Sequence, residues 1–204
     1  MVSISDFCYN NIFGYDCRNN ELYDYCVNNT FGNNCKGNII NTFCINNTFG
    51  NHCEYNNLGD NCEENTFGNN CQRNELNHEC SYNTFGNHCK YNEFATGCGY
   101  NNLLSGCERN VLSDYCTINT FGNHCDHNKL GRSNRQNIFG NDCNMNIFGN
   151  NCIYITFGNN CGYNTFGNAN NYITFGNNCV NNTFGNANKQ NTFGNNCQKN
   201  SFED

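Results

Sequence analysis

The sequence predicts an all-β protein, folded as a two-sided parallel β-solenoid (a β-roll or β-helix) with 18 residues per coil and about 11 coils. Three observations lead to this prediction. An apolar residue returns at every ninth position, Cys and Asn stand at fixed distances from it, and two unlike nine-residue units alternate. A fixed period of this kind is typical of repeat proteins, in which each unit is stabilised by stacking on its neighbours.

The apolar period begins at Ile4 and is still running at Phe202. Every ninth residue between them is Phe, Leu or Ile, which gives 23 positions without an insertion. Asn-rich chains are often disordered, and this chain has 53 Asn among its 204 residues. Disorder gives no reason to keep an apolar residue in register, so we expect residues 1–204 to form a single solenoid domain.

Two further columns follow the apolar one. Cys stands four residues after it in 19 of 22 places, and Asn stands two residues before it in 20 of 23 places. Residues in one column of a solenoid lie above one another, which predicts ladders of identical side chains. The predicted ladders include Phe31, Phe49, Phe67 and Phe85, then Cys35, Cys53, Cys71 and Cys89, and, at the corner of the coil, Asn29, Asn47, Asn65 and Asn83.

The coil length follows from a second period of 18. Alternate units carry Phe-Gly, whereas the units between them favour Leu or Ile up to about residue 130. Packed sheets lie ~10 Å apart, so a nine-residue coil is too small to enclose a core. A three-sided coil of 27 residues would mix the two kinds of unit in one column and ranks second.

Helix does not fit the pattern, because the apolar residues lack the i, i+3, i+4, i+7 spacing. We expect a strand of three or four residues around each Phe or Leu, followed by a turn at Asn-Asn-Cys-x-x. Asn suits such a turn because its side chain bonds nearby backbone and it tolerates left-handed conformations.

The 19 cysteines exceed the level that usually marks a secreted disulfide scaffold. Their pattern favours inward-facing free thiols instead, because single members are replaced by Asn134, Asn170 and Asn188 while the opposite column stays intact. Scattered disulfides remain a second interpretation. A metal site ranks third, since no C-x2-4-C pair exists.

No metal or cofactor site is predicted elsewhere. His52, His88 and His124 share an outward column but lie two coils apart, ~9.6 Å of rise, too far to share one metal ion. Calcium-binding rolls share the nonapeptide period but need repeated Gly-Gly-x-Gly-x-Asp turns, which are missing here. No nucleophile and base are linked by a motif, so we expect no catalytic residues and no enzyme.

One outward column is the candidate binding face: Tyr55, Arg73, Tyr91 and Arg109, followed by His127. Neighbours ~4.8 Å apart would stack as cation–π pairs and could contact a glycan or a protein. Further exposed aromatics are expected at Tyr82, Tyr100, Tyr154, Tyr163 and Tyr172. A Thr ladder before the Phe-Gly units resembles ice-binding solenoids, but its next outward position is Gly.

Charge gives weaker information. Ten Lys and Arg against 17 Asp and Glu leave a net charge of −7, which disfavours nucleic acid as a partner. Residues 1–8 do not read as a secretory signal, and no apolar run reaches the ~18 residues of a membrane span. We expect no membrane partner and a reducing compartment, cytoplasmic or virion.

The unit Asn-Thr-Phe-Gly-Asn-Asn-Cys resembles the Asn-rich nonapeptide arrays in uncharacterised proteins of gut Bacteroidetes and their phages. This resemblance implies a surface, tail-fibre or adhesion-type module. The leading hypothesis is therefore a non-enzymatic rod that presents a repetitive face to a protein or glycan. An acidic solenoid acting as a DNA mimic or enzyme inhibitor is the alternative, and ice binding is a remote one. End-to-end association of copies, or membership of a longer chain, stays open.

Overall fold

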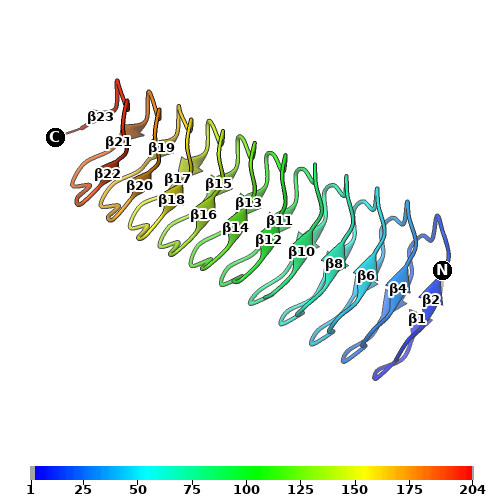
Figure 1. The fold of residues 1–204 in the computed structure, drawn as a ribbon. Helices are drawn as coiled ribbons and strands as arrows, with labels where there is room; N and C mark the ends of the chain where they lie inside the picture. Colours follow the sequence, from blue (N-terminus) through cyan, green and yellow to red (C-terminus); the bar gives the residue numbers. More distant parts are fainter. Residues whose placement is uncertain (1–2, 204) are drawn as a thin grey trace.

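The computed structural model describes residues 3–203, which form a stack of coils with the two termini at opposite ends (Figure 1). Within this range there are 23 short strands, all of them in two parallel sheets. No helix in residues 3–203 is long and apolar enough to cross a membrane. The two-sided parallel β-solenoid predicted from the sequence is confirmed.

The strands alternate between the two sheets along the chain. The twelve-stranded sheet contains β1 Ser3–Ile4, β3 Glu21–Leu22, β5 Ile39–Ile40, β7 Asn57–Leu58, β9 Glu75–Leu76, β11 Glu93–Phe94, β13 Val111–Leu112, β15 Lys129–Leu130, β17 Ile147–Phe148, β19 Thr165–Phe166, β21 Thr183–Phe184 and β23 Ser201–Phe202. The eleven-stranded sheet contains β2 Ile12–Phe13, β4 Thr30–Phe31, β6 Thr48–Phe49, β8 Thr66–Phe67, β10 Thr84–Phe85, β12 Asn102–Leu103, β14 Thr120–Phe121, β16 Ile138–Phe139, β18 Thr156–Phe157, β20 Thr174–Phe175 and β22 Thr192–Phe193.

The register of the sheets confirms the 18-residue coil. In β4 and β6, Thr30 lies opposite Thr48 and Phe31 opposite Phe49, and the same offset holds along both sheets. The strands themselves are shorter than predicted, with two residues rather than three or four. Isolated parallel bridges, such as that between Lys36 and Glu54, continue the stacking beyond the strands.

Each nine-residue unit turns at two corners. The third and sixth residues after each ladder Phe or Leu have positive φ, for example Asn34 (62°) and Gly37 (64°) after Phe31. Their N–H groups donate to carbonyls of the following coil, whereas strand N–H groups donate to the preceding coil, as in Asn34 N to Asn51 O (2.9 Å) and Thr48 N to Asn29 O (2.8 Å). These hydrogen bonds pair backbone N–H and C=O groups that would otherwise lack a partner at a left-handed corner.

Stacked aromatic rings fill the core. The Phe31 and Phe49 rings are nearly parallel, with centroids 4.7 Å apart and planes 7° apart, and both side chains are fully buried. Towards the C-terminus both sheets carry Phe, and rings then also meet edge to face across the core, as Phe166 and Phe175 do at 87°. Stacked and edge-to-face pairs are both favourable aromatic geometries.

The Asn column two residues before each apolar position forms the predicted amide ladder. Asn47 directly follows the corner residue Asn46, which has a φ of 56°, and its side chain is fully buried. Its N–H and Nδ2 both donate to Oδ1 of Asn65 (2.9 and 3.1 Å), and Nδ2 also donates to the Cys26 carbonyl (3.1 Å). A buried amide is tolerated here because these hydrogen bonds replace those made with water.

A second Asn ladder runs outside the first and in the opposite direction. Oδ1 of Asn33 accepts from the N–H of Asn51 in the following coil (2.7 Å), and Asn51 repeats this bond with Asn69. The sequence predicted that these turn side chains bond nearby backbone, and they do, with the backbone supplied by the adjacent coil. The bonding is between coils and adds to the stacking.

Candidate functional site

The predicted Tyr–Arg column lies on one edge of the twelve-stranded sheet. Tyr55, Arg73, Tyr91 and Arg109 are the sixth residues after successive ladder positions, and each has a φ between 54° and 58°. The next residue in each case is a buried Asn of the inner ladder. The backbone is therefore fixed, and the long side chains extend outward from a regular corner; we call these four residues the Tyr–Arg ladder.

The predicted cation–π contacts are present. Arg73 Cζ lies 5.5 Å from the ring centroids of both Tyr55 and Tyr91, and Arg109 Cζ lies 5.6 Å from Tyr91. Arg109 Nη1 also donates to the Tyr91 hydroxyl (2.7 Å). These contacts hold both faces of the Tyr91 ring, so the ladder is a pre-ordered surface. Its role in binding stays a prediction.

Beside the ladder runs the outward column of the twelve-stranded sheet, which the sequence analysis did not single out. Asn57 Nδ2 donates to Glu75 Oε2 (3.0 Å), and Glu75 pairs in register with Glu93. Like charges directly opposite are destabilising in a sheet. Arg73 lines the same hollow as both carboxylates and offsets their charge.

Two adjoining hollows lie between the ladder and this column. One, with a volume of about 350 Å³, is lined by Tyr55, Arg73, Glu75, Tyr91 and Glu93. The other, about 280 Å³, is lined by Gly37, Ile39, Tyr55, Asn56, Asn57, Arg73 and Glu75. A sequence signal existed for the second hollow, because Gly37 interrupts the column one coil before Tyr55.

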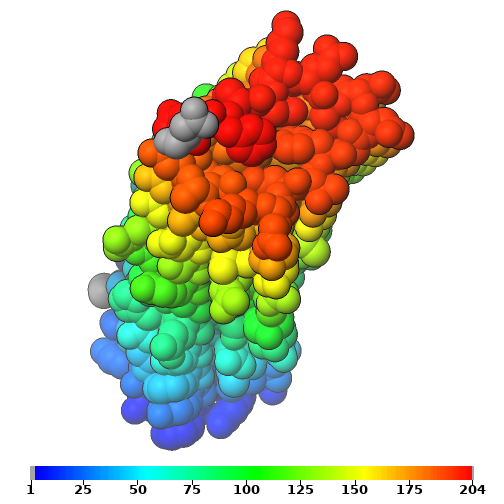
Figure 2. Space-filling view, turned by 90° about the vertical axis from the view of Figure 1, so that its left-hand side faces the viewer, coloured from blue at the N-terminus to red at the C-terminus, as the bar shows by residue number. Residues whose placement is uncertain are grey.

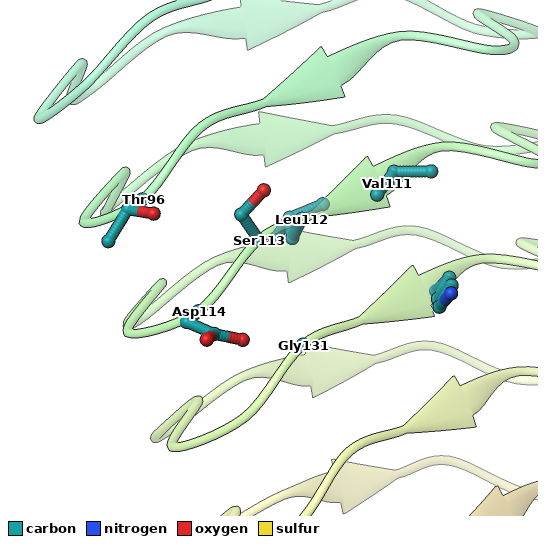
Figure 3. A pocket seen from close by; sticks show the side chains of 7 residues that line it. Thr96, Val111, Leu112, Ser113, Asp114 and Gly131 are labelled. Carbon is teal, nitrogen blue, oxygen red and sulfur yellow. The ribbon is translucent and has the colours of Figure 1, made fainter.

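Two more hollows lie on the other side of the outward column. The larger, about 370 Å³, includes Thr96, Val111, Ser113, Asp114 and Gly131 (Figure 3). The Arg132 backbone N–H and guanidinium bond to Asp114 and hold the pKa of that carboxyl below its usual value. These four hollows flank the outward column of the twelve-stranded sheet, and another of about 350 Å³ lies on the eleven-stranded sheet around Ile12, Gly14 and Thr30. Figure 2 shows side chains stacked in rows along the rod.

The other predicted aromatics lie in two places. Tyr82 and Tyr100 stack at 4.7 Å, and Tyr154 and Tyr172 stack at 4.8 Å, all four in the corner column that precedes the eleven-stranded sheet. Tyr163 belongs instead to the column of the Tyr–Arg ladder and is 56% exposed.

The predicted His column lies at corners of the coil. His52, His88 and His124 each occupy a corner with positive φ and are exposed. In this part of the chain no group of three or more His, Cys, Asp or Glu is arranged to hold a metal ion.

The thiol ladders point inward, as predicted. Fifteen of the 17 free cysteines in residues 3–203 are buried, and Cys17 and Cys197 are half-buried near the ends. Thiols donate to carbonyls of the preceding coil, as Cys71 Sγ does to Gly50 O (3.2 Å). Burial raises the pKa of the Cys152 thiol to about 11.

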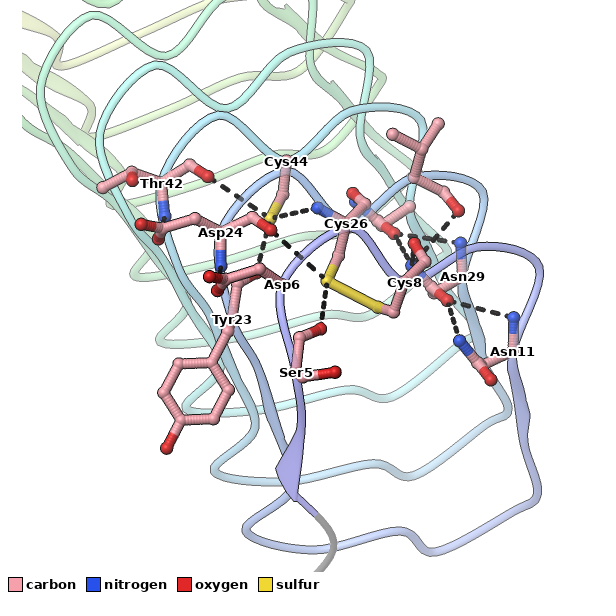
Figure 4. Close-up of a disulfide and its surroundings, with 12 residues drawn as sticks. Ser5, Asp6, Cys8, Asn11, Tyr23, Asp24, Cys26, Asn29, Thr42 and Cys44 are labelled. Atoms are coloured by element: carbon pink, nitrogen blue, oxygen red, sulfur yellow. Dashed lines mark hydrogen bonds between the residues drawn. A yellow bond between two sulfur atoms is a disulfide. The ribbon is translucent and has the colours of Figure 1, made fainter.

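One pair departs from the free-thiol prediction. Cys8 and Cys26, stacked in successive coils with Cα atoms 4.6 Å apart, form a disulfide (Figure 4). The Cα separation of stacked coils falls within the range that disulfides allow, so stacking itself brings such pairs within reach. The preference for free thiols therefore holds for the remaining cysteines and is wrong for this pair.

Comparison with known proteins identifies no family. No family model and no curated protein match the chain. Among solved structures it is similar to the surface adhesin PfbA of Streptococcus pneumoniae, with 8% identity and a TM-score of 0.33 over 89% of this chain and 72% of that one. It is also similar to a double mutant of the tailspike protein of E. coli bacteriophage HK620 in complex with a pentasaccharide, with 12% identity and a TM-score of 0.36.

The chain spans about half the length of that tailspike, covering 99% of its own residues and 55% of the tailspike chain. A third similar structure is the Agl-KA catalytic domain, with 9% identity, a TM-score of 0.29, and coverage of 99% of this chain and 56% of that one. Likenesses with TM-scores of 0.29 to 0.36 support no conclusion about this chain. Function has to be argued from the geometry of this chain.

Proposed function

We propose that this chain is a non-enzymatic scaffold: a rigid rod that presents a repetitive face to a glycan or a protein, as adhesion or phage-fibre modules do. The observation that supports this is the Tyr–Arg ladder beside two adjoining hollows on the twelve-stranded sheet. Aromatic and Arg side chains are enriched where proteins bind partners. Here they are held in place before any ligand arrives, which lowers the entropy cost of binding.

Rigidity is the second part of the proposal. Every coil is joined to the next by backbone hydrogen bonds and by Asn ladders inside and outside the core. A binding face built on such a stack keeps its spacing along the rod. The proposal has three further parts. The chain is related to the Asn-rich arrays of gut Bacteroidetes and their phages, it works in a reducing compartment, and residues 1–204 form one domain.

The DNA-mimic alternative is less well supported. A mimic needs an uninterrupted stripe of carboxylates, but three acids pair with cations of neighbouring coils: Glu54 with Lys36 (2.8 Å), Glu108 with Lys90 (3.0 Å) and Asp114 with Arg132 (3.1 Å). Pairing of this kind divides the negative surface. A pull-down with DNA-binding enzymes at low salt tests it, and the absence of binding would remove it.

A glycan array tests the leading proposal. We expect binding by the unaltered chain and loss of that binding in Tyr91→Ala, because this change removes the ring held between two guanidinium groups. Tyr100→Ala, in the opposite column, is the matched control and should bind normally. An array without hits, or equal loss in both variants, would contradict the glycan form of the proposal.

End-to-end association is a separate part of the partner prediction. Among residues 3–203, β1 pairs only with β3, and the Phe202 side chain in β23 is 50% exposed. Unpaired strand edges are templates for further pairing. Sedimentation of this chain at increasing concentration tests the prediction, and a monomer throughout would contradict it.

A further inference from the structure

The Tyr–Arg ladder has an open end at Tyr55. Arg73 covers one face of the Tyr55 ring, at 5.5 Å from its centroid. The residue in the same column one coil earlier is Gly37, which has no side chain to cover the other face. The exposures agree with this difference: Tyr55 is 55% exposed, whereas Tyr91, covered on both faces, is 39% exposed.

The missing side chain leaves a slot. This is the hollow of about 280 Å³ that contains Gly37, Ile39, Tyr55, Asn57 and Glu75. The Tyr55 ring and Ile39 supply apolar surface, and Ile39 is 43% exposed. Buried Asn56 of the inner ladder fixes the backbone between Tyr55 and Asn57. The slot is therefore a consequence of the fold rather than of a mobile loop.

Polar groups converge on one side of the slot. Asn57 Nδ2 donates to Glu75 Oε2 at 3.0 Å, which orients the carboxylate. Within residues 3–203, this bond to Oε2 is the one hydrogen bond that the Glu75 carboxylate accepts, so Oε1 can accept another from a ligand. Arg73 and Glu75 carry opposite charges, so the lining as a whole is neutral. Neutral lining favours an uncharged ligand over an anion or a cation.

One class of ligand fits this chemistry. A pyranose ring has a face of C–H groups that can lie against an aromatic ring, and a rim of hydroxyls that donate hydrogen bonds. Ligand pockets of ~300–1,000 Å³ bury drug-sized molecules, so a slot at the lower limit suits a single ring. A flexible peptide would gain less here, because the slot offers one open aromatic face.

We propose that the slot over Gly37 binds one neutral pyranose residue of a glycan, which stacks on Tyr55 and donates a hydroxyl hydrogen bond to Glu75. This inference rests on the proposed function and names its ligand class. The neighbouring hollow shares Tyr55, Arg73 and Glu75 with the slot, so the next sugar residue of a chain follows along the rod axis.

Filling the slot is the sharpest test. In Gly37→Tyr, the new ring should stack on the open face of Tyr55, as Tyr100 stacks on Tyr82 at 4.7 Å. Non-Gly residues at positive φ are the rule in this column, so the backbone accepts the change. The new Cβ would lie 2.7 Å from Asn19 Oδ1, so the Asn19 side chain has to move. Asn181→Tyr, in the same column far from the slot, is the matched control.

The probes are glucose, galactose, mannose and N-acetylglucosamine, and the measurement is saturation-transfer-difference NMR on the whole chain. We expect saturation of the C–H protons on one face of at least one sugar, unchanged in Asn181→Tyr and absent in Gly37→Tyr. Glu75→Gln keeps the shape but weakens the acceptor, and we expect about tenfold weaker binding from the loss of a charge-assisted hydrogen bond.

The outcomes separate the two proposals. Equal saturation in Gly37→Tyr and in the unaltered chain would overturn the slot, and so would the absence of saturation for all four sugars. If the glycan array still shows binding that Tyr91→Ala abolishes, the binding face survives and only its location at the slot is wrong. Circular dichroism and melting of each variant confirm that a loss does not come from unfolding.

Discussion

The side-chain amide of Asn47 donates a 3.1 Å hydrogen bond to the Oδ1 atom of Asn65, one coil further along the rod, and both residues are fully buried. Oδ1 of Asn65 also accepts the backbone N–H of Asn47 at 2.9 Å. One oxygen thus satisfies two buried donors of the preceding coil. Removing it leaves the Asn47 N–H without an acceptor in a core that excludes water.

We therefore expect Asn65→Ala to destabilise the rod by about 3 kcal/mol, because an unsatisfied buried donor and several lost bonds add to a cavity. Asn151→Ala is the matched control: Asn151 is exposed, and Ala169 and Ala187 occupy the same column with positive φ. The Asn151→Ala substitution should lower the free energy of unfolding by less than about 1 kcal/mol. Urea unfolding measures both, and equal midpoints would contradict the role of the ladder.

Gly50 gives a steric prediction. A Cβ at this position would lie 2.8 Å from both Asn33 N and Gly32 C, too close for a real contact. Gly14 occupies the same column and has nothing within 4 Å of its Cβ position. We expect Gly50→Ala to cost about 2 kcal/mol by overpacking and Gly14→Ala to be neutral or slightly stabilising. Equal thermal shifts in the two variants would show that glycine is not needed for the close approach of coils.

The buried thiols predict alkaline destabilisation. Burial raises the Cys152 pKa from 9.0 to about 11. Above pH 9 the unfolded thiol loses its proton while the folded one keeps it, so the native state binds more protons and stability falls as pH rises. The contribution of the Cys152 thiol to the free energy of unfolding is fully present below pH 9 and is lost by about pH 11. Cys152→Ser should show a smaller loss of unfolding free energy over this window, and an unchanged pH profile would refute the assignment.

The Cys8–Cys26 disulfide predicts a local effect of reduction. It links coils 18 residues apart, and closing a loop of this size is worth about 3 kcal/mol in the chain-entropy model. Hydrogen exchange should therefore accelerate in the first two coils after reduction and stay unchanged around Cys161. Peptide mapping without reductant shows whether the pair is oxidised. Protection that is the same in both states would contradict the stabilising role.

The sequence predicted much of the fold because its period is strict. An apolar residue at every ninth position, from Ile4 to Phe202, has one economical explanation, which is stacking with an 18-residue repeat. The Tyr–Arg contacts were predictable for the same reason, since residues 18 apart must lie one coil apart. The period therefore predicts which residues of neighbouring coils contact one another along the rod axis.

Other features depend on the direction in which a side chain points within one coil. The period of the sequence carries no information about this direction. The inner Asn column lies beside the corner as predicted, but the period did not predict that its side chains would be fully buried. The Cys8–Cys26 bond depends on side-chain approach and not on spacing, which is alike for most stacked cysteines. The two-residue strands reflect corners that come sooner than the pattern suggests.

The sequence by itself determined which residues stack, since repetition fixes neighbours along the axis. Only the tertiary structure decided which columns lie side by side around the coil, because that depends on backbone dihedrals at two corners per unit. The slot at Gly37 is a feature that the tertiary structure decided. Tyr55 and Glu75 are 20 residues apart and come from different columns, and the turn of the backbone at each corner brings them to the same hollow.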